Sequence, residues 1–229
     1  MFRPRLEPLF KDRRDAGRQL AAALMRYQQS SAVVLALPRG GVPVGFEVAK
    51  ALAAPLDVLL VRKIGAPGQA EFGLGAVVDG AEPQLVLNEE IVRRVRPPPG
   101  YIDEEMRRQL AEIERRRRRY LGDRPPAGVE GRIAIVVDDG IATGGTVRAA
   151  LRGLSRIRPA RLVLAVPVAP ADSLDELAGD CDDIVCLATP EPFFAVGHWY
   201  ENFSQTSDEE VRDLLGWSEC RESTVMPER

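Results

Sequence analysis

Five short apolar runs alternate along the chain with segments of helical periodicity. The runs are "SAVVLAL", "LDVLLVRK", "RIAIVVDD", "ARLVLAVPV" and "DDIVCLAT", and continuous apolar runs of this length are typical of strands buried on both faces. Residues 12–29 carry Leu20, Leu24 and Tyr27 at the spacing of an amphipathic helix, and further helices are predicted at about 42–53 and after the third and fourth runs. The pattern predicts an α/β fold in which a central parallel sheet of about five strands is flanked by helices.

The middle of the chain interrupts this alternation. Residues 63–75, "KIGAPGQAEFGLG", are rich in glycine and predict a mobile loop rather than a regular element. Two short apolar runs around "DGAEP" then predict a β-hairpin, and "YIDEEMRRQLAEIERRRRRYLG" predicts a long helix that is acidic first and basic last. We expect one domain over residues 1–229, with the hairpin and the long helix inserted at about 76–130. A closing helix is predicted from Ser207, which stands three residues before Glu210 in a capping-box spacing.

The composition is that of an ordinary globular protein and argues against several functional classes. With 45% hydrophobic residues, 28% charged residues and a net charge of −3, nothing in it requires a nucleic-acid or membrane partner. No apolar run approaches the roughly 18 residues that span a bilayer, and the cysteines Cys181, Cys186 and Cys220 lack paired C-x-x-C spacing, so we expect a cytoplasmic protein. His198 is the only histidine, which argues against a zinc centre with several histidine ligands and against a histidine-based triad.

The segment "RIAIVVDDGIATGGTVRAAL" (132–151) combines two kinds of ligand chemistry at the end of a strand. Ligands of open α/β sheets bind beyond the carboxyl ends of the strands, which is where Asp138 and Asp139 stand. The following "ATGGT" begins a helix, whose free N–H groups and dipole favour an anion such as phosphate. Two carboxylates repel a phosphate at close range, so a neutral, hydroxyl-rich spacer such as a sugar is expected between them. A ribose 5-phosphate meets this description.

The same segment excludes two common nucleotide motifs and resembles a third. No lysine follows the glycines as in an ATP-type P-loop, and the carboxylates precede the glycines, unlike in a dinucleotide fingerprint. "VVDDGIATGGT" closely resembles the motif with which type I phosphoribosyltransferases bind 5-phosphoribosyl 1-pyrophosphate (PRPP). The resemblance implies the Rossmann-like fold of that family, with Asp138 and Asp139 holding the ribose hydroxyls and acting in catalysis through electrostatics and positioning. It also implies that the 5-phosphate binds to Ala142, Thr143, Gly144, Gly145 and Thr146.

Two further segments fit the resemblance. "LPRGG" (37–41) follows the first buried strand, at the sheet edge expected for Asp138, and resembles the pyrophosphate loop of the family. Backbone amides bind the leaving group in that loop, here those of Arg39, Gly40 and Gly41. Arg62 and Lys63 end the second run and are either solvated charges or groups that neutralise departing pyrophosphate, with Lys63 as a catalytic candidate. The glycine-rich loop after them resembles the flexible loop of the family, whose closure excludes water.

A magnesium ion is the cofactor that the resemblance implies. Pyrophosphate and ribose oxygens of PRPP would chelate Mg²⁺, together with water. The bound ion would offset the charge of the leaving group. We therefore expect no dedicated set of metal-ligating side chains in the protein.

The sequence defines the acceptor less well than the donor. In the 6-oxopurine enzymes of this family an aspartate precedes the T-G of the loop; here that position is Ala142, an arrangement that is closer to the adenine enzyme. The candidate acceptor hood is the segment at about 189–206, which is rich in aromatic rings that can stack on a flat base. The candidate acceptor residues are Phe193, Phe194, Trp199 and Tyr200. The alternative is that these rings cap the hydrophobic core.

The run "RRRRR" at 115–119 leaves a second class of function open. A nucleic-acid site is one interpretation, but five consecutive arginines circle a helix rather than form one stripe. Acidic residues of the same helix balance them, which favours a solvated helix or a subunit contact, for example in a homodimer. We therefore expect an enzyme that transfers 5-phosphoribose from PRPP to a nitrogenous acceptor, preferably a nucleobase, and releases pyrophosphate. The alternative is a regulator that senses PRPP or a nucleotide without turnover and binds RNA through the arginine run.

Overall fold

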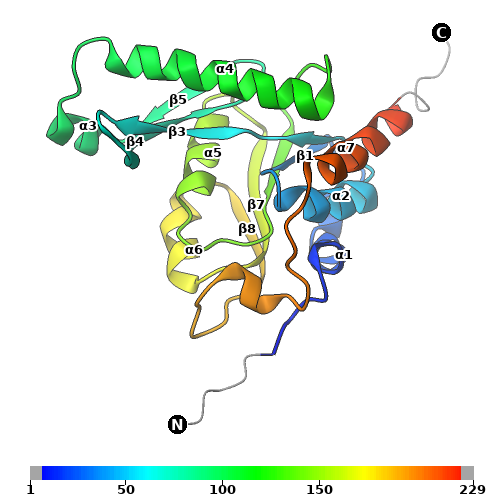
Figure 1. Ribbon diagram of the computed structural model, residues 1–229. Helices are drawn as coiled ribbons and strands as arrows, with labels where there is room; N and C mark the ends of the chain where they lie inside the picture. The colour runs from blue at the N-terminus through cyan, green and yellow to red at the C-terminus, as the bar shows by residue number, and fades with distance from the viewer. Residues whose placement is uncertain (1–6, 223–229) are drawn as a thin grey trace, which may run out of the picture.

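A computed structural model describes residues 7–222 of the chain, with side chains as far as Gly216, so Cys220 lies outside the described side chains. A central parallel sheet forms the body of the protein, with the strand order β2-β1-β6-β7-β8 (Figure 1). Its strands are β1 (Ala32–Ala36), β2 (Leu56–Val58), β6 (Ile133–Val137), β7 (Arg161–Val168) and β8 (Asp183–Ala188). The prediction of about five parallel strands is therefore confirmed.

Helices cover both faces of the central sheet. One face carries α1 (Arg13–Ala23), α2 (Gly41–Leu52) and α7 (Asp208–Glu222), and the other carries α5 (Gly145–Ser155) and α6 (Ala171–Leu177). Successive strand residues point to opposite faces. Val34 and Ile135 therefore pack with the first group of helices, whereas Val33 and Ala134 pack with the second. This double covering explains why the strands are continuously apolar.

A second, antiparallel sheet of three strands lies next to the first, in the order β3-β4-β5. It comprises β3 (Val61–Ala66), β4 (Gln69–Val78) and β5 (Gln84–Leu87), so the hairpin predicted around "DGAEP" is confirmed. Two other predictions are wrong. The run "LDVLLVRK" divides between the two sheets, and residues 63–75 form the β3–β4 hairpin, with a turn at 67–68, rather than a mobile loop. The second sheet begins at Val61, ahead of residue 76, where we expected the insertion to start.

The glycines of this region have two roles: Gly68 lies in the turn between β3 and β4, with a φ of 71°, whereas Gly65 marks a close approach of two backbones. The pairing of β3 with β4 shifts register on either side of Gly65. A Cβ at that position would lie 2.5 Å from the carbonyl oxygen of Ala70, a distance that no side chain tolerates. The glycine-rich composition that suggested a loop is therefore the composition of an irregular strand pair with a bulge.

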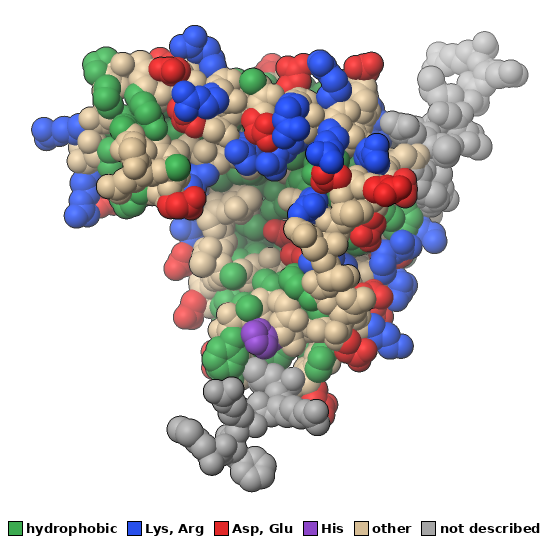
Figure 2. All heavy atoms as spheres, viewed as in Figure 1, with side chains coloured by type: hydrophobic (Ala, Val, Ile, Leu, Met, Phe, Trp, Pro, Cys, Tyr) green, Lys and Arg blue, Asp and Glu red, His purple; other side chains and the backbone are tan. Residues whose placement is uncertain are grey.

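Helix α4 (Tyr101–Leu121) covers the antiparallel sheet on the face opposite α5 (Figure 1). Acidic and basic side chains intermix over this layer at the surface (Figure 2), and three arginines of the run pair with acids of their own helix: Arg115 and Arg116 with Glu112, and Arg118 with Glu114. Arg117 is different, because it is only 9% exposed and bonds to Asp57 at 2.8 Å and to Asp79 at 2.9 Å. The expectation of a solvated helix is wrong for Arg117, which joins the two sheets.

The helices include one that the sequence analysis missed. α3 (Glu89–Val95) begins after Asn88, whose Oδ1 accepts a hydrogen bond from the Ile91 amide at 3.1 Å, as an N-cap does. The predicted closing helix is confirmed by α7, where Ser207 Oγ accepts a hydrogen bond of 3.0 Å from the Glu210 amide. Among the described helices none is both long enough and apolar enough to cross a membrane.

Candidate active site

Two loops meet at the carboxyl edge of the central sheet, one after β1 and one after β6. Because Ala36 pairs with Val137 across these strands, the chain leaves both strands at the same level. A Cβ at Gly40 would overlap with Oδ2 of Asp139, and a Cβ at Gly41 would lie 2.7 Å from the carbonyl oxygen of Val137. Glycine is needed for so close an approach, and it makes the "RGG" loop and the aspartates one continuous surface.

The acid pair lies half-buried at this edge. Asp138 Oδ1 accepts a hydrogen bond of 2.8 Å from the Asp139 amide. Burial, and then the negative charge of Asp139, raises the pKa of Asp138 well above its usual value. Asp139 has a cationic partner, since its Oδ2 accepts a hydrogen bond of 2.7 Å from Nε of Arg13. Two carboxylates with one counter-cation retain acceptor oxygens for a ligand that brings hydroxyl donors.

Residues 140–144 lead from the acids into α5. Ile141 anchors this loop, because its side chain is buried and its amide donates to the Val168 carbonyl at 2.9 Å. The Ala142 carbonyl accepts a hydrogen bond of 3.0 Å from the Ser173 hydroxyl. The exposed residues that follow are Thr143, Gly145 and Thr146. They stand at the N-terminus of an 11-residue helix, where free N–H groups and the positive end of the helix dipole favour a phosphate.

The loop after β1 contributes its backbone to this edge. The Pro38–Arg39 peptide bond is cis, and α2 begins shortly after it. The Arg39 guanidinium lies 3.8 Å from Oδ1 of Asp208 at the start of α7. The Arg39 side chain therefore turns toward α7, while the glycines after it face the acid pair.

Arg62 and Lys63 lie within β3 rather than at the end of a central strand, so they point to opposite faces of the antiparallel sheet. Arg62 Nε donates to Oε1 of Gln109 on α4 at 2.9 Å, so its side chain faces away from residues 142–146, the candidate phosphate loop. Lys63 Nζ donates to the Glu71 carbonyl at 2.6 Å. Lys63 also lines a cavity of ≈ 390 Å³ with three residues of the α5 N-terminus: Thr143, Gly145 and Thr146. The structure brings Lys63, and not Arg62, to the side of the phosphate loop.

The aromatic residues of the candidate hood fall into two groups. Trp199 and Tyr200 are 3% and 4% exposed, and they pack with Phe10 in a small core cluster. Phe194 is 67% exposed, and Phe193 is half-buried. For Trp199 and Tyr200 the burial favours the alternative that they cap the core, which leaves Phe193 and Phe194 as the accessible rings among the four candidates.

Arg13 is the residue at this edge that the sequence analysis missed. It stands 126 positions before its partner Asp139, at the start of α1, and its side chain is only 12% exposed. The sequence carries no signal for this contact, because an arginine in the first turn of an amphipathic helix is ordinarily a solvated residue.

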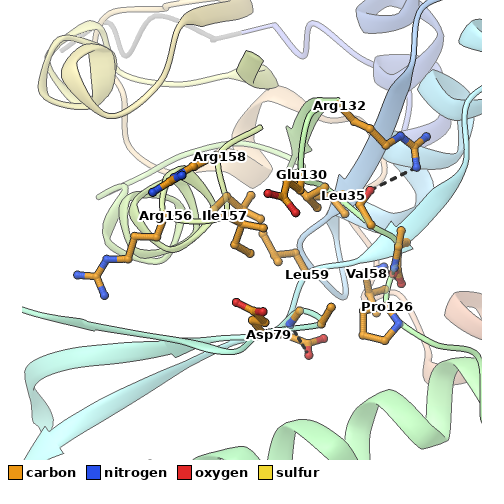
Figure 3. Close-up of a pocket in the computed structure, with 18 of the residues that line it drawn as sticks. Leu35, Val58, Leu59, Asp79, Pro126, Glu130, Arg132, Arg156, Ile157 and Arg158 are labelled. Carbon is orange, nitrogen blue, oxygen red and sulfur yellow. Dashed lines mark hydrogen bonds between the residues drawn. The ribbon is translucent and has the colours of Figure 1, made fainter. Parts of the chain in front are cut away.

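A separate cavity of ≈ 500 Å³ lies near the opposite end of β6, where the two sheets adjoin (Figure 3). Asp79 and Arg117 belong to its lining. Two of its arginines extend in opposite directions in Figure 3, with Arg132 bonded to the Ala32 carbonyl and Arg156 to the Leu85 carbonyl. This cavity does not share the acids or the phosphate loop, so we place the candidate site at the carboxyl edge.

Known proteins resemble this chain over most of its length. A family model described as "Phosphoribosyl transferase domain" matches residues 10–198. A protein of Mycobacterium tuberculosis strain H37Rv, named "Putative phosphoribosyl transferase Rv0571c", is 51% identical over 207 residues, which are 90% of this chain. These residues are 46% of that protein, so the chain spans about half the length of the curated relatives it matches.

A solved structure also matches. The crystal structure of TT1426 from Thermus thermophilus has a TM-score of 0.79 and 44% sequence identity with this chain, and the match covers 90% of this chain and 97% of that one. The family match extends over both loops of the sheet edge, from Arg13 through the acid pair to α5. By the extent of that match, the chain belongs to the phosphoribosyl transferase domain family.

Proposed function

We propose that the chain transfers the 5-phosphoribosyl group of PRPP to a nitrogenous acceptor and releases pyrophosphate. One observation carries the proposal: an acid pair, a helix N-terminus and a glycine loop adjoin at one edge of the central sheet. Each suits a different part of PRPP, namely the ribose hydroxyls, the 5-phosphate and the pyrophosphate. Membership of the family supports the same class of reaction.

The protein binds the donor at three points in this proposal. Asp138 and Asp139 accept hydrogen bonds from the ribose hydroxyls. The 5-phosphate lies against the amides of residues 142–146, with the hydroxyls of Thr143 and Thr146 as further donors. The amides of residues 39–41 bind the pyrophosphate.

Charge is the main contribution of the protein to the transfer itself. As the C1–O bond of PRPP breaks and the bond from the acceptor nitrogen to C1 forms, positive charge develops on the sugar ring. The half-buried carboxylates of Asp138 and Asp139 stabilise that charge. Lys63, on the strand that faces α5, supplies positive charge on the side of the phosphates.

The chemistry of the acid pair fits a magnesium ion. Mg²⁺ takes oxygen ligands and retains several waters, and Asp138 and Asp139 offer carboxylate oxygens beside the phosphate loop. Among the described side chains, those of residues 7–216, no three His, Cys, Asp or Glu groups gather around a common point. We propose that most of the ligands come from PRPP and water. When bound there, the ion would offset the charge of the leaving pyrophosphate.

We propose a nucleobase as the acceptor, which would make the protein an enzyme of nucleotide metabolism. Of the four candidate acceptor rings in the hood at about 189–206, Phe193 and Phe194 are the accessible ones, and aromatic rings stack on flat bases. Ala142 has no side-chain group to pair with a 6-oxopurine, which favours adenine as the first base to test.

A product assay tests the proposal. The protein is incubated with PRPP, Mg²⁺ and a panel of nucleobases, and both pyrophosphate and nucleotide are measured. The double variant Asp138→Asn with Asp139→Asn is the control for the donor site and is expected to lose PRPP binding. PRPP binding without product from any base would favour the regulator that senses PRPP, and undiminished PRPP binding by the double variant would refute the role of the acids.

A further inference from the structure

Arg13 connects the acid pair to residues 200–204, which belong to the candidate hood. Its Nε donates to Oδ2 of Asp139 at 2.7 Å, and its Nη1 donates to the carbonyl oxygen of Ser204 at 2.6 Å. The guanidinium carbon lies 3.9 Å from the centre of the Phe203 ring, which is a cation–π distance. The side chains of Arg13 and Asp139 are 12% and 15% exposed, so water screens their ion pair only weakly.

A second contact ties the same segment to the same acid. The Tyr200 hydroxyl donates to the backbone carbonyl of Asp139 at 2.6 Å, and the Tyr200 ring lies 5.0 Å from the Phe203 ring. Burial raises the pKa of Tyr200, so its hydroxyl remains a hydrogen-bond donor. Asp139 is therefore held through its carboxylate by Arg13 and through its backbone by Tyr200.

The neighbouring arginine provides a comparison within the same helix. Asp12 caps α1 by accepting a hydrogen bond in its first turn, which fixes the backbone at both arginines. Arg14 pairs with Glu47 and lies 4.6 Å from the Phe46 ring. Both of these partners belong to α2, so Arg14 makes the same two kinds of contact in helix packing that Arg13 makes at the sheet edge.

We propose that Arg13 is a positioning residue of the phosphoribosyl transfer site. It keeps the Asp139 carboxylate directed at the ribose hydroxyls, and it couples that carboxylate to residues 200–204. Without Arg13, the Asp139 carboxylate would lose the donor that orients it, and the Tyr200 hydroxyl would hold only the backbone of Asp139. A carboxylate that is poorly oriented is the weaker acceptor for hydroxyl groups. The inference rests on the proposed function in taking PRPP as the ligand. The coupling of Asp139 to residues 200–204 does not depend on PRPP, because it is a property of the ligand-free protein.

Three variants of the full chain test this role: Arg13→Gln, Arg13→Lys and, as a matched control, Arg14→Gln. In calorimetric titration with PRPP and Mg²⁺, we expect Arg13→Gln to bind PRPP at least about tenfold more weakly, because a charge-assisted contact to Asp139 is lost. Arg13→Lys is expected to recover part of the affinity, since lysine retains the charge without the planar set of donors. Arg14→Gln is expected to bind PRPP as the unaltered protein does, even if its unfolding temperature falls.

Hydrogen–deuterium exchange of the ligand-free variants tests the coupling independently of PRPP. Faster exchange at residues 138–140 and 200–204 in Arg13→Gln, but not in Arg14→Gln, supports the proposal. Equal effects of the two glutamine substitutions on PRPP affinity and on exchange, including no effect of either, would overturn it. If the unaltered protein binds no PRPP, the proposed function fails, and the exchange comparison still decides whether Arg13 couples the two segments.

Discussion

Substitution of Arg117 tests how the two sheets are held together. Its guanidinium donates to both oxygens of Asp57, at 3.1 and 2.8 Å, and to Oδ2 of Asp79 at 2.9 Å. Asp57 belongs to β2 of the central sheet, and Asp79 follows β4 of the antiparallel sheet. Arg117 therefore links the sheet that carries Lys63 to the sheet that carries the acid pair, and Arg117→Ala removes that link.

The expected cost follows from the burial of the two acids. Asp57 and Asp79 are 2% and 4% exposed, and Arg117→Ala leaves both without their common cation. Asp57 keeps hydrogen bonds from two backbone amides and an ion pair with the Arg124 guanidinium at 3.6 Å. Asp79 keeps a hydrogen bond from the Gly80 amide, so most of the loss falls on Asp79. Removing one partner of a buried ion pair costs about 3–5 kcal/mol of unfolding free energy, which for a chain of this size lowers the unfolding temperature by roughly 6–20 °C.

Two further variants separate the buried charge from other effects. Arg118 forms an exposed pair with Glu114 one turn along the same helix, and Arg118→Ala is expected to cost only about 0.3–0.5 kcal/mol. Arg117→Met keeps much of the apolar stem but not the charge. If the charge is what matters, Arg117→Met destabilises the protein nearly as much as Arg117→Ala does.

The pH dependence gives an independent check. Burial raises the pKa of Asp79 even though Arg117 opposes the shift, and without Arg117 the pKa rises further. The folded variant then binds a proton that the unfolded chain has released, so the penalty of Arg117→Ala shrinks as the pH falls toward the usual aspartate pKa. Urea unfolding at about pH 8 and about pH 5 measures this change. A penalty equal to that of Arg118→Ala, or one that grows on acidification, would refute the reasoning.

Three other substitutions are expected to change the site in distinct ways. Asp138→Asn should raise the unfolding temperature of the ligand-free protein at neutral pH, because the raised pKa of Asp138 means that its charge opposes folding; scanning calorimetry should find the gain lost as the pH falls below the usual aspartate pKa. Gly40→Ala should weaken PRPP binding in calorimetric titration by displacing the carboxylate of Asp139, whereas Gly179→Ala, where a Cβ meets no atom within 4 Å, should not. Tyr200→Phe should cost about 1 kcal/mol in urea unfolding through loss of its buried hydrogen bond, and an unchanged midpoint would contradict that role.

The strands were predictable wherever burial is uniform over a whole element. β1 and β6 are apolar throughout because helices cover both of their faces, and the run length alone identifies them. The boundary between β2 and β3 was not predictable on the same grounds. Leu59 and Leu60, which connect them, are each 3% exposed, so the apolar run continues through the point at which the chain passes from one sheet to the other. The burial of Arg117 was not predictable either. It is one of five consecutive arginines, and the sequence does not indicate which of them is buried.

In the candidate site, too, some residues were predictable from the sequence and one was not. The end of β6, the acids, the loop and the start of α5 occupy eleven consecutive residues, so one local pattern is enough to indicate a sugar phosphate. Arg13 and Arg14 are adjacent and of the same type, yet one meets Asp139 and the other Glu47. Neighbouring side chains on a helix differ in direction by about 100°, so the rotation of α1 decides which arginine reaches the acid pair. The residues that α1 buries, among them Leu20, set that rotation, and the apolar spacing in residues 12–29 indicates them. Which acid Arg13 then meets depends on where the rest of the protein packs against α1, and no pattern within residues 12–29 contains that.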